Sequence, residues 1–305
     1  MPKHAFFQGK IVPIEEAKIS IMTHGFNYGT GCFEGIRGYW NQQEEQLYVF
    51  RLKEHYERMH RSARILRIDL PFGVEELGKS TLDLLRLEGY REDVYIRPLA
   101  YKASEVIGVR LHNLEDGFAM FSLPFGRYIE NEEGVHVCIS GWRRVDDNAT
   151  PARAKITGAY VNSALSKTDA VLSGYDEALV LDESGHISEG SAENFFMVRD
   201  GALITPAITS NILEGITRET IITLAREEMG MQTYERPIDR SEVYICDESF
   251  LTGTGVQVAA ITRIEHRPIG SGTIGPVVSR LRELYFDVVR GENPSYKHWC
   301  TPVYV

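Results

Sequence analysis

The sequence is poor in lysine, carries an excess of acidic residues and lacks long apolar runs. Only 9 of its 33 basic residues are lysines, and the formal net charge is −10. This acidic balance argues against general nucleic-acid binding, which needs a basic face. No apolar run approaches the roughly 20 residues that span a bilayer, and the first ten residues lack the apolar core of a signal peptide. We therefore expect neither nucleic acid nor a membrane as partner.

Cysteine is also scarce. The four cysteines show no CxxC spacing and no accompanying histidine; they are Cys32, Cys138, Cys246 and Cys300. This pattern is typical of reduced thiols in a cytoplasmic protein, and it excludes a disulfide framework or a zinc site of the usual spacing. We expect a cytoplasmic protein without a bound metal.

Signatures of several common enzyme classes are missing as well. No Gly-x-Gly-x-x-Gly follows the first predicted strand, and no phosphate-binding loop ends in Gly-Lys-Ser/Thr. The His-Glu-x-x-His and Gly-x-Ser-x-Gly motifs do not occur. These absences weigh against dinucleotide chemistry, P-loop phosphoryl transfer, zinc hydrolysis and the α/β-hydrolases.

The elements that are present predict an α+β protein. Apolar residues three or four apart predict helices at 51–68, 74–87, 160–173, 215–229 and 276–289. Alternating or short apolar runs predict strands at 4–7, 11–12, 93–101, 117–123, 135–142, 177–182, 194–198, 202–205, 243–246, 249–252 and 256–264. The runs 177–182 and 194–198 are expected to pair as a hairpin. Strands and helices do not alternate regularly, which favours the α+β class.

Length and a polar stretch at 126–134 predict two domains. A chain of 305 residues suggests about two domains. We predict a small N-terminal domain at 1–127, a linker at 128–134 and a larger C-terminal domain at 135–305. This division leaves Phe33 and Arg97 on one side and Lys155 and Glu189 on the other. It therefore predicts an active site between the domains.

Lys155 has an unusual context for a lysine. Its neighbours in the run Pro151–Tyr160 are mostly small or apolar, with Arg153 as the other charge. A lysine partly removed from water loses its proton readily and can attack a carbonyl carbon. The alternative is an ordinary surface lysine.

Other residues are suited to hold an anionic cofactor. Gly215–Arg218 begins a predicted helix, with Thr217 as a capping candidate, and a helix start is a natural phosphate seat. The turn Gly253–Gly255 also exposes amides. Arg58 offers a bidentate phosphate contact, or else a surface ion pair with Glu54 or Glu57. Glu189 is suited to pair with a cationic ring nitrogen, or else belongs to a polar turn.

Taken together, these motifs resemble the branched-chain aminotransferases among the class IV pyridoxal-phosphate enzymes. The resemblance covers roughly residues 5–290 and rests on motifs in the same order as in that family. They are Asn27-Tyr28-Gly29, Phe33-Glu34-Gly35-Ile36-Arg37, Tyr95-Ile96-Arg97-Pro98-Leu99, Lys155…Tyr160, Ser188-Glu189-Gly190…Glu193-Asn194, Gly215-Ile216-Thr217-Arg218 and Gly253-Thr254-Gly255. It implies the fold of the D-amino-acid-aminotransferase-like enzymes, fold type IV. In this fold a small α/β domain precedes a larger domain with a mixed, barrel-like sheet.

The resemblance implies a pyridoxal 5′-phosphate site. Lys155 would hold the cofactor as an internal aldimine and move the proton between substrate and cofactor. Glu189 would pair with the pyridine nitrogen, and Tyr160 would bond the phenolic oxygen. Four residues would hold the phosphate: Arg58, Ile216, Thr217 and Thr254. Glu193 is assigned a structural role.

The resemblance also implies where substrates bind and how the chain assembles. Phe33, Tyr95, Arg97 and Tyr128 would line the substrate side, and the amides of Thr254 and Gly255 would bind the substrate carboxylate. Tyr28 and Val109 would reach into the partner's pocket, so active sites near the interface of a homodimer or higher homo-oligomer are expected. The implied reaction is transamination between L-branched-chain amino acids and 2-oxoglutarate.

Other activities stay open at the level of sequence. The turn Gly253–Gln257 reads Gly-Thr-Gly-Val-Gln, where many family members have Gly-Thr-Ala-Ala-Glu. This departure lies at the carboxylate end of the site and keeps a D-amino-acid or (R)-amine transaminase as the alternative. An aminodeoxychorismate lyase is a third possibility. A non-catalytic metabolite-binding protein is disfavoured because Lys155, Glu189, Arg58 and Tyr160 are all retained.

Overall fold

The computed structural model describes residues 2–126 and 133–304, and contacts divide the chain into two compact units. Unit 1 comprises Met1–Gly126, Ala154–Gly158 and Asp287–Val305, and unit 2 comprises Arg127–Arg153 and Ala159–Phe286. Lys155 therefore groups by its contacts with the N-terminal part of the chain, although it follows the predicted linker. Most of that linker, with Tyr128, lies outside the described residues.

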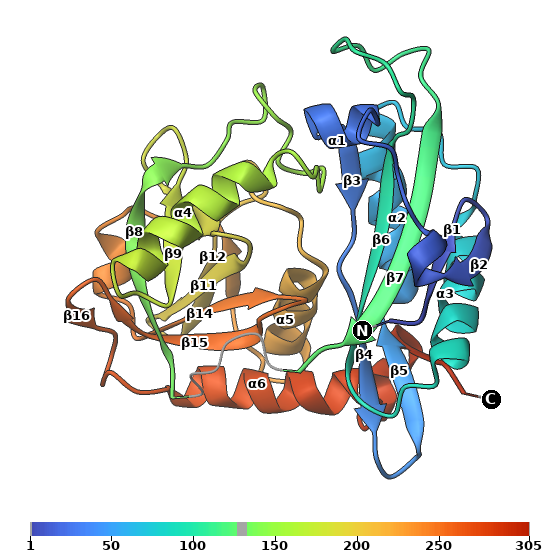
Figure 1. The fold of residues 1–305 in the computed structure, drawn as a ribbon. Helices are drawn as coiled ribbons and strands as arrows, with labels where there is room; N and C mark the ends of the chain where they lie inside the picture. Colours follow the sequence, from blue (N-terminus) through green and yellow to red (C-terminus); the bar gives the residue numbers. More distant parts are fainter. Residues whose placement is uncertain (1, 127–132, 305) are drawn as a thin grey trace. The chain divides into compact units, whose positions relative to one another are not determined.

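Unit 1 is built on an antiparallel sheet (Figure 1). Its strands are β1 (His4–Phe7), β2 (Lys10–Pro13), β3 (Gly31–Phe33), β4 (Ile36–Asn41), β5 (Gln46–Phe50), β6 (Val94–Lys102), β7 (Asp116–Pro124) and β17 (Cys300–Pro302). They follow the order β17-β5-β4-β6-β7-β1-β2, and β3 pairs with β6. Along β6 buried and half-buried residues alternate, as expected when successive side chains point to opposite faces.

The helices of unit 1 pack on this sheet and on each other. They are α1 (His24–Tyr28), α2 (Leu52–Ile65) and α3 (Val74–Glu88), with 3₁₀ turns at Ile14–Glu16 and Pro294–Trp299. Leu52, Tyr56, Met59 and Ala63 are buried on α2, at the spacing of three or four that predicted this helix. α2 contacts α3 and β3. The same face of α2 carries His55, Arg58 and Ser62 toward the candidate site.

Unit 2 is built on a mixed sheet. Its strands are β8 (Val135–Arg143), β9 (Glu177–Leu181), β10 (Ile187–Gly190), β11 (Asn194–Arg199), β12 (Ala202–Thr205), β13 (Thr233–Glu235), β14 (Glu248–Gly253), β15 (Gln257–Ile264) and β16 (Arg267–Pro268). The order is β10-β9-β8-β15-β14-β11-β12-β13, and β16 pairs with β15. The pairs β8–β9, β8–β15 and β12–β13 are parallel.

The helices of unit 2 are α4 (Tyr160–Leu172) and α5 (Ile216–Glu227), and α6 (Pro276–Val289) includes residues of both units. α4 lies against β8 and β9, and α5 lies against β13 and β14 (Figure 1). Fully buried side chains such as Phe195, Met197 and Leu251 form the core of the sheet. In the described part of the chain no helix has the length and apolarity needed to cross a membrane.

Three local predictions are wrong. Residues 243–246 do not form a strand, since Glu242–Tyr244 is a 3₁₀ turn. β9 forms its hairpin with β10, whereas β11 pairs with β12 and β14. Thr217 does not cap α5, because Gly215 occupies the N-cap position and Thr217 lies inside the helix. The α+β class and all five predicted helices are confirmed.

Candidate active site

Three of the predicted site residues of unit 1, Phe33, Tyr95 and Arg97, lie together beside one face of β6. Tyr95 and Arg97 are two residues apart on this strand, so their side chains share a face. Arg97 donates from Nε and Nη2 to the Tyr95 hydroxyl at 3.2 and 2.8 Å. Its guanidinium carbon also lies 4.4 Å from the centroid of the Phe33 ring. Stacking and two hydrogen bonds therefore fix the orientation of this arginine.

Lys155 lies beside the same aromatic ring. Its Nζ is 5.0 Å from the centroid of the Phe33 ring, and the residue is partly buried. The backbone carbonyl of Lys155 accepts from the amide of Phe33 at 3.0 Å. Its amide donates to the Ser62 hydroxyl on α2 at 3.1 Å. Hydrogen bonds from the main chain of Lys155 to Phe33 of β3 and to Ser62 of α2 thus hold the residue next to the Phe33 ring. The amine is partly buried, as the small and apolar neighbours of Lys155 in the sequence suggested.

The partner of Arg58 is the buried carboxylate of Glu34. It is neither Glu54 nor Glu57. Its Nε and Nη2 donate to the two oxygens of Glu34, each at 2.7 Å. His55, one turn earlier on α2, donates from Nδ1 to Glu34 at 2.8 Å. Burial raises the pKa of Glu34, but the charge and hydrogen bonds of Arg58 and His55 outweigh it and lower that pKa to about 2. Arg58 is therefore oriented by a permanent carboxylate.

Tyr28 and Val109 lie near each other at an exposed edge of unit 1. The Tyr28 hydroxyl accepts from the amide of Gly108 at 3.0 Å. Val109, the next residue, is 81% exposed. The His24 ring contacts the Tyr28 ring and bonds the carbonyl of Gly108. These contacts join α1 to the loop after β6, and they bring the two predicted interface residues together.

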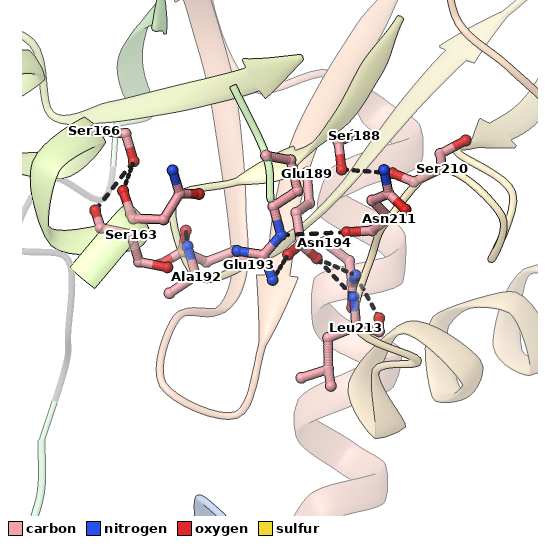
Figure 2. Close-up of polar contacts among 12 residues, drawn as sticks. Ser163, Ser166, Ser188, Glu189, Ala192, Glu193, Asn194, Ser210, Asn211 and Leu213 are labelled. Atoms are coloured by element: carbon pink, nitrogen blue, oxygen red, sulfur yellow. Dashed lines mark hydrogen bonds and ion pairs between the residues drawn. The ribbon is translucent and has the colours of Figure 1, made fainter. Parts of the chain in front are cut away.

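In unit 2, Glu189 is the centre of a buried polar network. Its side chain is 4% exposed, and Oε1 pairs with Nη2 of Arg144 at 2.8 Å. Oε2 accepts from the Asn194 amide at 3.2 Å and from the amide of Leu213 at 3.1 Å. Figure 2 shows Glu189, Asn194 and Leu213 facing one another. The polar-turn interpretation is incomplete, because Glu189 belongs to β10 and is bound on both oxygens.

The predicted phosphate residues of unit 2 lie just beyond this network. Leu213 leads through Gly215 into the first turn of α5, where Ile216 and Thr217 are buried. The first amides of a helix favour an anion. Thr254 and Gly255 form the turn between β14 and β15, next to the strand residue Thr252 that pairs with Asn194. Tyr160 begins α4 at partial exposure.

Glu193 is buried behind the network. Its Oε2 accepts from the amide of Ala192 at 3.0 Å. Burial, and then the negative charge of Glu177, raise the pKa of Glu193 to about 8. Glu177 itself is paired with Lys167 at 2.6 Å. At neutral pH Glu193 is therefore mostly a neutral acid.

Comparison with known proteins decides the family. A model of the class IV amino-transferases matches residues 31–264. The chain belongs to the class IV aminotransferases. A probable branched-chain-amino-acid aminotransferase of Aquifex aeolicus (strain VF5) is 52% identical over 300 residues, which cover 98% of this chain and 96% of that protein.

Solved structures agree with this assignment. The branched-chain amino acid aminotransferase of Thermobaculum terrenum in its PLP form has a TM-score of 0.95 at 39% identity, covering 100% of this chain and 99% of that one. The T.th. branched-chain amino acid aminotransferase complexed with N-(5′-phosphopyridoxyl)-L-glutamate has a TM-score of 0.94 at 41% identity, again covering 100% and 99%. These likenesses confirm the resemblance and the fold-type IV architecture.

Several residues around the candidate site escaped the sequence analysis. Glu34 and His55 position Arg58, and Arg144 and Asn194 hold Glu189. Glu34 and Asn194 stood inside quoted motifs, so their position was visible although their contacts were not. Arg144 carried no local signal, because it reaches Glu189 across 45 residues of chain. In the described ranges, no group of three or more acidic, histidine or cysteine side chains is arranged to hold a metal ion.

Proposed function

We propose that this class IV aminotransferase transfers the amino group of L-leucine, L-isoleucine or L-valine to 2-oxoglutarate. Pyridoxal 5′-phosphate is the cofactor, and we propose that Lys155 binds it covalently. The observation that carries the proposal is the grouping of Lys155 with Phe33 and Arg97 in a chain of this family. The names of the relatives support the choice of branched-chain substrates.

The donor set of the chain fits each polar group of this cofactor. When bound, the cofactor supplies a protonated ring that accepts electrons from the substrate Cα. Glu189, a carboxylate held by Arg144 and two N–H donors, is suited to the ring nitrogen. Tyr160 is assigned to the phenolic oxygen. A guanidinium, two helix-start amides and a hydroxyl suit the phosphate; they belong to Arg58, Ile216, Thr217 and Thr254.

Lys155 is assigned the proton transfer. Its Nζ is the amine that takes the proton from the substrate Cα and returns it to the cofactor. Positioned proton transfer of this kind contributes about 10²–10⁴ to a rate. The Phe33 ring beside Nζ excludes water from one side of the amine.

The surroundings of Arg97 suit both kinds of amino donor, the branched-chain amino acids and glutamate. Phe33 and Tyr95 offer aromatic surface to a branched aliphatic side chain. The guanidinium of Arg97 and the Tyr95 hydroxyl offer donors to the γ-carboxylate of glutamate. The turn amides of Thr254 and Gly255 are assigned to the α-carboxylate that all these substrates share. The solved relative that carries an L-glutamate adduct supports glutamate as the second donor.

We propose that two copies associate through the exposed apolar edge of unit 1. Its most exposed members are Ile21, Phe26, Ile107 and Val109, between 68% and 81% exposed. Large apolar side chains gathered on an exposed surface mark interaction sites. This edge also carries Tyr28, the residue assigned to the partner's pocket. Sedimentation of the purified protein measures the assembly directly, and a monomer would contradict this part of the proposal.

A reducing compartment is the location we propose. All four cysteines are free, three of them are buried, and burial raises the pKa of the Cys32 and Cys300 thiols to about 12. Inert reduced thiols are typical of cytoplasmic proteins.

The central test uses amino donors with 2-oxoglutarate as acceptor. L-Leucine should be the good donor, and D-alanine and (R)-1-phenylethylamine poor ones. Lys155→Ala should lose the absorbance of covalently bound cofactor and at least about 10²-fold in rate, because the proton carrier is gone. Lys53→Ala, at a lysine on the exposed face of α2, is the control that should change neither. A preference for D-alanine, or a colourless wild-type protein after reconstitution, would overturn the proposal.

A further inference from the structure

Asn194 joins two parts of unit 2 that the proposed function assigns to opposite ends of the cofactor. Its Nδ2 donates to Oε2 of Glu189 at 3.2 Å and to the carbonyl of Leu213 at 2.9 Å. The amide of Leu213 in turn donates to the same Oε2 at 3.1 Å. Glu189, Asn194 and Leu213 thus form a closed triangle of hydrogen bonds (Figure 2). Asn194 is 5% exposed, so water does not compete freely for these bonds.

The segment that Asn194 holds leads directly into α5. Leu213 is three residues before Ile216, the first residue of the helix. Between them, Gly215 lies so close that a Cβ there would overlap Oδ1 of Asn194. The Asn194 side chain therefore contacts the segment at both Leu213 and the N-cap residue. It fixes the start of α5 relative to the carboxylate of Glu189.

A second link runs from the other oxygen of Glu189. Arg144 pairs with Oε1 through Nη2, and its Nε donates to the carbonyl of Asn211 at 3.2 Å. Both oxygens of Glu189 are therefore tied to residues 211–213. A separate bond, from the Ser188 hydroxyl to the carbonyl of Ser210 at 2.6 Å, anchors the same segment without using Glu189. A variant that removes the Ser188 bond therefore loosens residues 210–213 without breaking the links through Glu189.

We propose that Asn194 is a positioning residue that keeps the ring-nitrogen carboxylate and the phosphate-binding helix start at a fixed separation. The inference rests on the proposed function, which assigns Glu189 to the ring nitrogen and Ile216 and Thr217 to the phosphate. A rigid separation benefits a ligand that engages both ends at once. It does little for a ligand that engages only one end, because such a ligand does not depend on the alignment of the two.

Three probes with the purified enzyme test this positioning role. Pyridoxal 5′-phosphate engages both ends, pyridoxal lacks the phosphate, and inorganic phosphate lacks the ring. Asn194→Ala should weaken the two-ended ligand by about 10-fold or more, and each one-ended ligand by less than about 3-fold. Asn194→Leu keeps a similar shape, adds no charge and loses the amide donors, so it should show the same pattern. It also serves if the alanine variant folds poorly.

Ser188→Ala is the matched control, because it loosens the same segment and leaves the Glu189 triangle intact. It should weaken all three probes by similar factors or leave them unchanged. The inference is overturned if Asn194→Leu binds pyridoxal 5′-phosphate within about 3-fold of wild type. It is also overturned if the variant weakens all three probes alike, which is the result of a merely structural role. A wild-type protein with no affinity for pyridoxal 5′-phosphate would overturn the proposed function itself, and this inference with it.

Discussion

Replacing Glu193 by glutamine should stabilise the protein, and more so at higher pH. Glu193 is buried, and its pKa is raised to about 8 by burial first and by the charge of Glu177 second. Glu177 also forms an ion pair with Lys167 at 2.6 Å. Glutamine keeps the shape of the neutral acid and an oxygen for the amide of Ala192. It cannot ionise, which removes the conflict between burial and charge.

The sign and size of the effect follow from proton linkage. The unfolded chain ionises this carboxyl near pH 4.5, whereas the folded protein holds the proton up to about pH 8. Between these values the folded state binds more protons, so stability falls as pH rises. At about 1.4 kcal/mol for each pH unit above 4.5, the loss due to Glu193 is about 3 kcal/mol at pH 7 and below about 1 kcal/mol at pH 5.

Thermal unfolding at the two pH values measures this difference. With an unfolding entropy of about 2.1 cal/mol/K per residue, Glu193→Gln should raise Tm by roughly 5 °C at pH 7 and by roughly 1 °C at pH 5. Glu183→Gln, at an exposed glutamate of the turn after β9, is the control and should shift Tm little at either pH. An equal shift at both pH values, or a less stable variant at pH 7, would refute the reasoning.

The remaining predictions concern unit 1. Glu34→Gln should lower stability by about 3 kcal/mol because it weakens a buried ion pair with Arg58. Since the pKa of Glu34 is about 2, the carboxylate contribution is complete above about pH 4.5 and is lost only as pH falls toward 2, so the Tm difference from wild type should be constant from pH 5 to 8. Gly35→Ala places a Cβ against the Tyr95 hydroxyl that holds Arg97. Steady-state kinetics should show KM for 2-oxoglutarate rising about 10-fold, more than KM for L-leucine, and equal rises would contradict the role of Arg97.

The sequence predicted best those elements whose pattern is local. α2 and α3 bury one face at helical spacing, and that spacing is visible in the sequence. The glycine-rich stretch 25–40 showed no clear period, yet it forms α1, β3 and β4. The strands β3 and β4 both pair with β6, which is distant in the sequence, so the local sequence does not predict them. The partner of β9 was misassigned because the short strand β10 looked like a polar turn.

The candidate site shows the same distinction between local and long-range signals. The context of Lys155 was local, and the structure shows its amine beside an aromatic ring. The partner of Arg58 was sought among its neighbours Glu54 and Glu57, but the partner is Glu34, in a motif 24 residues earlier. Helix geometry places Arg58 on the inner face of α2, where a buried guanidinium needs a buried carboxylate. Which carboxylate fulfils that need depends on the tertiary fold.

These pairings change what the net charge of −10 implies. An anionic cofactor in so acidic a chain raises the question of what attracts it. Arg58, however, shares its charge with the ionised Glu34, and Arg144 shares its charge with Glu189. If the proposed assignment of the phosphate holds, the phosphate would meet a compensated guanidinium and neutral amides, whose directed N–H groups supply most of the attraction. Because directed donors act over a few ångströms, a distant negative charge does little to weaken them. The acidic surface and the anionic ligand are compatible for this reason, and the orientation of Arg58 by Glu34 matters more than its charge.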